Sequence, residues 1–176
     1  MPRVLVAVTG TPGTGKSSAC AVLERRGYLV VDLNQVALRE GLIVGHDDSR
    51  DSDEVDVDEL RGRLRIAAKV ASLRSHSSHW MAVDLAVVLR CRPSVLRRRL
   101  EARGWTPAKV HENVEAEAID VITQAAAERL SLVSEVDTTS RSPEQTAEAI
   151  LGILQGQTKG HEAGSVDWSE EVLSWY

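Results

Sequence analysis

The chain has 176 residues, of which 43% are hydrophobic and 27% charged, and its formal net charge is −5. This composition predicts one soluble globular domain and excludes binding of nucleic acid through an overall positive field, so we expect no direct DNA binding. No apolar run approaches the roughly 20 residues of a membrane span, and no signal peptide fits before the first strand. We therefore expect a cytoplasmic protein with no membrane partner.

The first informative stretch is an apolar run over 4–8, followed by Gly10-Thr-Pro-Gly13-Thr-Gly15-Lys16-Ser17 and a helical segment over 18–26. The octapeptide has the P-loop spacing G-x-x-x-x-G-K-[ST] between a strand and a helix. Glycines let backbone N–H groups approach phosphates, Lys16 reaches the β and γ phosphates, and Ser17 offers a hydroxyl to Mg²⁺. A chance octapeptide would lack the flanking strand and helix, so the motif predicts a nucleoside triphosphate site.

Residues 28–32 are predicted to form the second strand, and 34–40 a short helix that begins at its carboxyl end, where open α/β sheets bind ligands. Asp32 and Arg39 flank this helix. Arg39 is either a solvated helix charge or a clamp on a second phosphate. Residues 46–59 contain eight acidic residues, and we predict a solvated loop there that is either inert or a substrate flap.

A helix is predicted over 60–67 and a third strand over 69–74, followed by a polar turn with two histidines. His76 and His79 form either a metal-binding pair or part of a polar turn beside the phosphates. No third ligand lies nearby in the sequence, which favours the polar turn over a zinc site. Cys20 and Cys91 form no C-x-x-C pair, and we expect both to be reduced core residues.

The rest of the chain alternates strands and helices. We predict strands over 84–90 and 132–136, and helices over 93–103, 106–130 and 143–154, the last opened by a capping box at 142–145. Residues 156–165 are predicted to be flexible, and 166–175, acidic with two tryptophans, to dock on the body or on a partner. The alternation predicts a parallel α/β sheet with helices on both faces.

Five stretches together identify a family resemblance: the P-loop, the Ser75–His79 turn, 87–93, 103–115 and 166–171. They resemble the archaeal adenylate kinases of the isoenzyme 6 type, relatives of the eukaryotic coilin-interacting nuclear ATPase, over nearly the whole chain. The resemblance implies a three-layer P-loop NTPase fold with a five-stranded parallel sheet. It also implies a kinase domain over 1–155, with an AMP-binding segment at about 33–56 and a short lid at about 102–112, before a linker and tail over 156–176.

The resemblance also implies an activity and a set of site residues. Members transfer a phosphoryl group from ATP to AMP, giving two ADP; they also hydrolyse ATP and assist maturation of the small ribosomal subunit, binding a small-subunit ribosomal protein. Lys16 and Arg103 are implied as catalytic, and Arg39, Asp32 and His76 as contacts on the AMP side. The implied ligands of MgATP are Gly13, Gly15, Lys16, Ser17, Ser18 and Arg103, with Ser17 on Mg²⁺.

One departure from the family pattern concerns Mg²⁺. Relatives carry an acidic residue two positions before the histidine that matches His76, and this chain has Arg74 there. Asp84 is no substitute, because it begins a strand at the far end of the sheet, whereas Asp32 ends a strand on the phosphate side. Either the metal relies on Ser17 and water, or turnover is weak.

The expected reaction is in-line phosphoryl transfer to an acceptor oxygen that is already anionic, so no general base is needed. A short lid excludes water poorly, which fits an ATPase side activity. The competing hypothesis is a nucleotide-switched ribosome assembly factor with little kinase activity, whose acidic segments 46–59 and 166–176 bind a basic partner. A kinase for another small acceptor is a third alternative.

Overall fold

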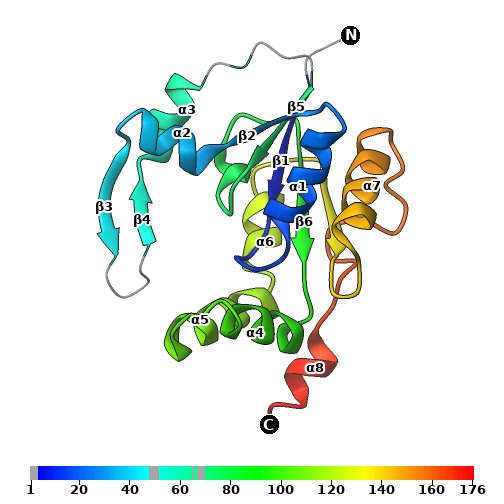
Figure 1. Cartoon of the computed structure of the whole chain (residues 1–176). Helices are drawn as coiled ribbons and strands as arrows, with labels where there is room; N and C mark the ends of the chain where they lie inside the picture. Colours follow the sequence, from blue (N-terminus) through cyan, green and yellow to red (C-terminus); the bar gives the residue numbers. More distant parts are fainter. Residues whose placement is uncertain (1–3, 48–51, 65, 67–69) are drawn as a thin grey trace.

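Five parallel strands form the centre of the molecule in the computed structural model, which describes residues 4–47, 52–64, 66 and 70–176. The strands stand in the order β2-β5-β1-β6-β7, so the strand that leads into the P-loop is central (Figure 1). Val6 lies opposite Ser72 on one side and Leu85 on the other. The predicted five-stranded parallel sheet is confirmed. Its members are β1 Val4–Thr9, β2 Leu29–Asp32, β5 Val70–Arg74, β6 Leu85–Arg90 and β7 Val133–Asp137.

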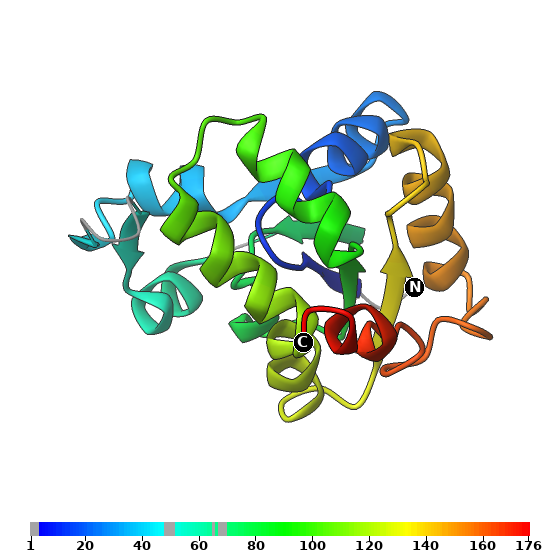
Figure 2. The same ribbon diagram turned by 90° about the horizontal axis from the view of Figure 1, so that it is seen from below.

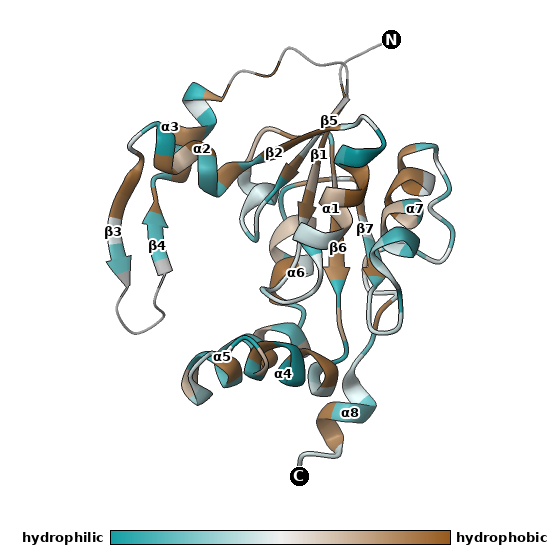
Figure 3. Ribbon diagram, viewed as in Figure 1, coloured by the Kyte–Doolittle hydropathy of each residue, from teal (hydrophilic) through white to brown (hydrophobic). Residues whose placement is uncertain are grey.

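Helices cover both faces of this sheet, because alternate side chains of each buried strand point to opposite sides. Val6 and Val8 pack on the face covered by α1 (Lys16–Arg25) and α7 (Pro143–Leu154). Leu5 packs on the other face with α2 (Leu33–Arg39) and α3 (Val57–Arg63). Ala7 packs on that same face with α6 (Val121–Ala127). Figure 3 shows the resulting apolar centre, with polar residues on the outer sides of the helices.

The acidic segment predicted to be a loop over 46–59 is mostly regular structure, so that prediction is wrong. β3 (Ile43–Asp47) and β4 (Ser52–Val55) pair antiparallel, while the predicted loop's residues 48–51 lie outside the described residues. Asp56 then caps α3 by accepting from the Glu59 N–H at 2.9 Å. The hairpin projects beyond α2 and α3 (Figure 1). It was missed because its exposed strands lack the apolar alternation of a half-buried sheet.

The single helix predicted over 106–130 is two helices, α5 (Pro107–Ala118) and α6. Asp120 separates them with a φ of 59°, a left-handed conformation that a short polar side chain tolerates better than most. Its carboxylate is paired with Arg90. The break lets α5 pack against α4 (Pro93–Glu101), below the sheet, while α6 returns to cover it (Figure 2).

The segment predicted to be flexible, 156–165, runs beside β7. The Glu135 N–H donates to the His161 carbonyl at 2.7 Å, and Ser134 forms an antiparallel bridge with Glu162. The chain then turns under the sheet into the short helix α8 (Ser169–Leu173), and Trp168 is buried there. Of the two docking alternatives, this part of the tail contacts the body.

None of the helices within the described ranges has the length and apolar character needed to cross a bilayer.

Candidate active site

The loop between β1 and α1 takes the form that its glycines predict. Gly10 has a φ of 137° and Gly13 a φ of 91°, in the region where side chains are rarely tolerated. A Cβ at Gly10 would lie 2.4 Å from the Leu89 carbonyl oxygen, and one at Gly13 would lie 2.8 Å from the side chains of Leu96 and Leu100. The loop therefore touches β6 and α4 at two points where only hydrogen fits.

Lys16 is the first residue of α1 and folds back over the loop. Its Nζ donates to the Gly10 carbonyl at 2.6 Å and to the Thr11 carbonyl at 3.0 Å. Burial lowers the pKa of Lys16 to about 7, the charge of Glu117 opposes that shift, and the charge of Arg103 adds to it. A bound phosphate would supply the negative charge that a buried ammonium needs, so the site is suited to an anion.

Ser17 and Ser18 lie exposed in the first turn of α1, where helix N–H groups face an anion. Ser17 fits the role of a hydroxyl ligand to Mg²⁺ beside phosphate oxygens and water. Asp32 does not fit the role of a second ligand. Its Oδ1 accepts from the N–H groups of Asn34 at 3.0 Å and Gln35 at 3.3 Å, and its Oδ2 is paired with Arg74.

Arg74 and Asp32 are neighbours across the pairing of β5 with β2, so each neutralises the other at this edge of the site. Asp84 lies where the sequence places it, at the opposite end of the sheet: its Oδ2 accepts from the Leu5 N–H at 2.7 Å. At the position where the resemblance led us to expect an acidic residue, this chain thus has an arginine that is ion-paired between two strands.

The two histidines lie in the turn after β5 but do not form a metal pair. The Thr9 hydroxyl donates to the His76 carbonyl at 2.9 Å and lies 3.2 Å from Nδ1 of His79. Nδ1 of His79 therefore donates to Thr9, and its Nε2, among the described residues, has no partner. Burial, then the charges of His76 and Arg129, lower the pKa of His79 to about 4. Within the described ranges, no three His, Cys, Asp or Glu side chains are grouped for a metal.

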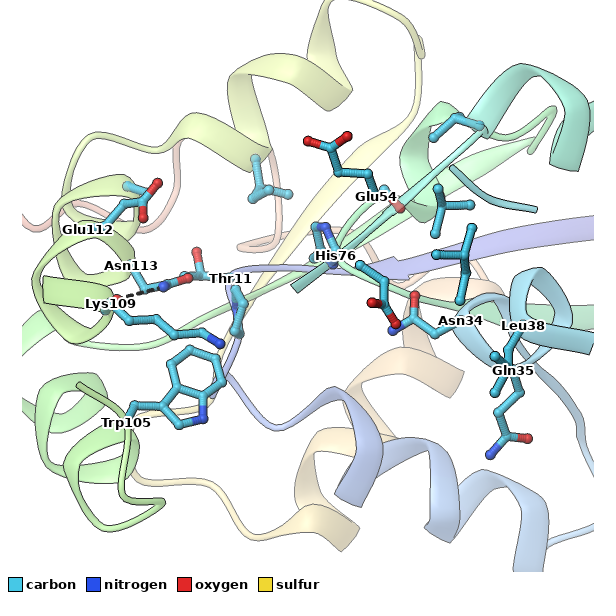
Figure 4. Close-up of a pocket in the computed structure, with 18 residues that line it drawn as sticks. Thr11, Asn34, Gln35, Leu38, Glu54, His76, Trp105, Lys109, Glu112 and Asn113 are labelled. Atoms are coloured by element: carbon cyan, nitrogen blue, oxygen red, sulfur yellow. Dashed lines mark hydrogen bonds between the residues drawn. The ribbon is translucent and has the colours of Figure 1, made fainter. Parts of the chain in front are cut away.

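Next to the P-loop is a cavity of about 850 Å³ (Figure 4). One wall comes from α2 and the hairpin, the other from α5, and the P-loop and His76 lie between them. Lys109 of α5 lies over the ring of Trp105, with Nζ 4.3 Å from the ring centroid. The labelled lining residues are Thr11, Asn34, Gln35, Leu38, Glu54, His76, Trp105, Lys109, Glu112 and Asn113. Amides, an aromatic ring, apolar side chains and the carboxylates of Asp53, Glu54 and Glu112 surround a space beside the anion site, which suits a small polar molecule with a flat ring.

Two predicted arginines stand outside this cavity wall. Arg39 is exposed at the end of α2, although its neighbour Leu38 lines the cavity. Arg103 is exposed in the turn between α4 and α5, near enough for its charge to act on Lys16. The structure thus places the P-loop and His76 in the lining of the cavity and Asp32 at the N-cap of α2, whereas neither arginine lines the cavity.

Two residues near the loop were missed by sequence reasoning. Arg99 of α4 donates to the Thr138 carbonyl at 2.9 Å and to the Gly13 carbonyl at 3.5 Å. Glu117 of α5 is buried and accepts from the Thr11 hydroxyl at 2.7 Å. Helical spacing carried the signal: Glu117 follows Val114 by three residues and so lies on the buried face of its helix.

Comparison with known proteins agrees with this geometry. The family model described as an AAA domain matches residues 6–120. A relative from Archaeoglobus fulgidus is 41% identical over 96% of this chain and 94% of its own. Another, from Natronomonas pharaonis, is 43% identical over 95% of this chain and 99% of its own. Both carry the name "Putative adenylate kinase".

Solved structures show the same fold at lower identity. The YorR protein from Bacillus subtilis, in complex with phosphorylated GDP, matches 90% of this chain and all of its own with a TM-score of 0.57 and 15% identity. Deoxyadenosine kinase from M. mycoides, with bound dATP, matches 87% of this chain and all of its own with a TM-score of 0.54 and 14% identity. This chain has the α/β fold of P-loop kinases, and it belongs to the AAA domain family and to the family of these archaeal relatives.

Proposed function

We propose that the chain is an adenylate kinase, which reversibly transfers the γ-phosphoryl group of MgATP to AMP and yields two ADP. The observation that carries the proposal is the P-loop with its buried Lys16, placed beside a cavity of about 850 Å³. The archaeal relatives support it, because they align with nearly the whole chain. In this proposal the triphosphate binds the P-loop and AMP occupies the cavity.

The chain's own groups would act by positioning and by charge. Backbone N–H groups of the loop and the start of α1 hold the phosphates, and Lys16 balances charge on the transferred group. The acceptor oxygen of AMP is already anionic, so no side chain has to remove a proton. Mg²⁺, held by Ser17 and the phosphates, would neutralise further charge.

Closure of two segments would complete the site. We assign AMP binding to about 33–56 and the lid to about 102–112, both within a kinase domain over 1–155. Arg39 would then reach the AMP phosphate and Arg103 the triphosphate, because Arg39 follows Leu38 of the cavity lining and the charge of Arg103 already acts on Lys16. In this arrangement Trp105 offers a flat face on which a base can stack, and Asn34 and Gln35 offer amides to its edge.

The finer parts of the resemblance remain predictions: the isoenzyme 6 relationship, the ATPase side activity, and rRNA maturation through a small-subunit ribosomal protein. The exposed acidic hairpin offers such a basic partner one charged surface with Asp53 and Glu54 on β4, two residues that also line the cavity. The linker and tail over 156–176 were the other proposed surface, and much of that segment is occupied by contacts with the body.

The deciding experiment follows ADP and inorganic phosphate separately in purified protein with MgATP, with and without AMP. A kinase forms about two ADP per AMP consumed, with little phosphate, and Lys16→Ala abolishes the signal. Phosphate release that ignores AMP would contradict the proposal and favour an ATPase or a nucleotide switch. An AMP requirement would also show that the Asp32–Arg74 ion pair is compatible with turnover.

A further inference from the structure

A buried carboxylate, that of Glu117, connects the P-loop to the C-terminal segment. Its Oε2 accepts from the Thr11 hydroxyl at 2.7 Å. Its Oε1 accepts from Arg90 Nε at 2.8 Å, the Cys91 N–H at 3.0 Å and the Trp168 indole N–H at 3.3 Å. Four donors thus converge on one carboxylate that is 2% exposed: one from the P-loop, two from the end of β6 and the residue after it, and one from the C-terminal segment.

A second buried carboxylate, that of Glu135 on β7, holds the same C-terminal segment. One of its oxygens accepts from Arg90 at 2.5 Å and from the Thr123 hydroxyl at 2.7 Å. The other accepts from the N–H groups of Gly164 and Val166, each at 3.0 Å. Because a buried carboxylate is costly unless donors surround it, residues 164–168 supply part of the hydrogen bonding that these two side chains require.

Arg90 is the centre of this cluster. It is 1% exposed and contacts three carboxylates, those of Glu117, Glu135 and Asp120. Burial alone would lower the pKa of Arg90, but the charge of Glu117 and its hydrogen bond, followed by the charges of Glu135 and Asp120, raise it above the usual range. One cation cannot satisfy three carboxylates, so the N–H groups of Gly164, Val166 and Trp168 supply the additional hydrogen bonds that Glu117 and Glu135 need.

The far end of the segment is fastened as well. Glu171 of α8 accepts from the Ser94 N–H at 2.6 Å, at the start of α4, and lies 3.7 Å from Arg92. α4 in turn touches the P-loop, because its residues Leu96 and Leu100 fill the space left by Gly13. The segment therefore reaches the loop by two routes, one through Glu117 and one through α4.

We propose that Glu117 is a positioning residue for the phosphate-binding loop, and that residues 164–171 form a brace which holds its carboxylate in place. The loop is oriented through the Thr11 hydroxyl, and the charge of Glu117 also supports the ammonium of Lys16. The proposal rests on the proposed function only in that the P-loop binds phosphate groups. Coupling between two sites is reciprocal, so nucleotide binding at the loop must also change the surroundings of Trp168.

The first test uses the full chain labelled with 5-fluorotryptophan, whose four ¹⁹F resonances are assigned by single Trp→Phe substitutions. ADP should shift the Trp168 resonance in the wild type. Thr11→Val, which removes only the hydroxyl, should abolish that shift and weaken ADP binding roughly three- to tenfold. Thr11→Ser, which restores a hydroxyl, should recover the shift and most of the affinity.

A Trp168 resonance that ignores ADP in the wild type, or that moves equally in Thr11→Val, would overturn the proposal. The outcome is separable from that of the kinase proposal. A protein that binds ADP and shows the coupled shift, yet transfers no phosphoryl group to AMP, contradicts the proposed function and keeps the brace. A protein that does not bind ADP contradicts both.

The second test examines the brace and the charge separately. Trp168→Phe removes the indole N–H that donates to Glu117 and should weaken ADP binding. Trp175→Phe, the matched control at a side chain that is 41% exposed, should leave ADP binding unchanged. Glu117→Gln removes the main charge that raises the pKa of Lys16, while Arg103 and Arg74, which lower that pKa, remain, as does the smaller raising effect of Cys20. Lys16 of this variant should therefore lose its proton at a lower pH, and ADP affinity should decline at a lower pH than in the wild type. Equal affinities for the two tryptophan variants would refute the brace. If Glu117→Gln does not fold, Thr11→Val decides.

Discussion

Replacing Lys16 by methionine should stabilise the ligand-free protein while it abolishes nucleotide binding. The pKa of Lys16 falls from 10.5 to about 7 because the ammonium is buried, and this difference corresponds to about 4 kcal/mol of folding free energy at pH 7. Methionine has a similar length and carries no charge, so the variant escapes that cost. The carbonyls of Gly10 and Thr11 then each lose the hydrogen bond from Lys16, at about 1 to 1.5 kcal/mol each, although Thr11 still accepts from the Thr14 hydroxyl at 2.8 Å.

The net gain is therefore about 1 to 2 kcal/mol for Lys16→Met at pH 7. The gain should shrink as the pH rises. Because the folded pKa lies below the unfolded value, the unfolded chain holds more protons between about pH 7 and 10.5, and the wild type becomes more stable across that window. Between pH 7 and 8.5 the wild type should recover about 1 to 2 kcal/mol relative to the variant.

Urea unfolding of both proteins at pH 7.0 and 8.5 measures these differences, in a buffer free of phosphate and sulfate so that no anion occupies the P-loop. Lys16→Arg is a useful companion, because it keeps the charge and should not gain stability. The reasoning is refuted if Lys16→Met is less stable than the wild type at both pH values, or if the difference between them does not change with pH.

Three further predictions concern the surroundings of the loop. His79, with a folded pKa of about 4 against 6.5, should cost the wild type up to about 3 kcal/mol as the pH falls through that window; His79→Gln, unfolded in urea from pH 7 to 4, should lack this loss. Gly10→Ala should lower the melting temperature far more than Gly15→Ala, because the new Cβ at position 10 would lie 2.4 Å from a main-chain oxygen. A Cβ at position 15 meets nothing within 4 Å, so Gly15→Ala carries only the backbone strain of a φ of 99°, which costs about 1 to 2 kcal/mol of stability. Arg74→Met should release Asp32 as a metal ligand and lower the Mg²⁺ concentration needed for half-maximal ADP formation; an unchanged requirement would show that Asp32 plays no part.

The sheet and the P-loop could be predicted because their signals are local. The runs over 4–8 and 84–90 are continuous and apolar, as buried parallel strands require, and the glycine spacing of the loop has one structural interpretation in that setting. The reduced, buried state of Cys20 and Cys91 follows from the same reasoning and agrees with the structure.

The missed features depend on contacts between segments far apart in the chain. Asp120 stops a helix whose local pattern continues, because its carboxylate meets Arg90 of a distant strand. Asp32 has the right position for a metal ligand, but its pairing with Arg74 appears only when β2 lies beside β5. Glu117 shows only as a charge on a buried helix face, and its partners come from residues 11, 90, 91 and 168.

The contacts of Glu117 and Glu135 also bear on how the protein matures while it is being synthesised. The P-loop leaves the ribosome about 150 residues before the donors from Gly164, Val166 and Trp168. Until then both acids are short of donors and the loop lacks part of its support. A growing chain should therefore hold nucleotide weakly, and tight binding should begin only when the late segment has folded back.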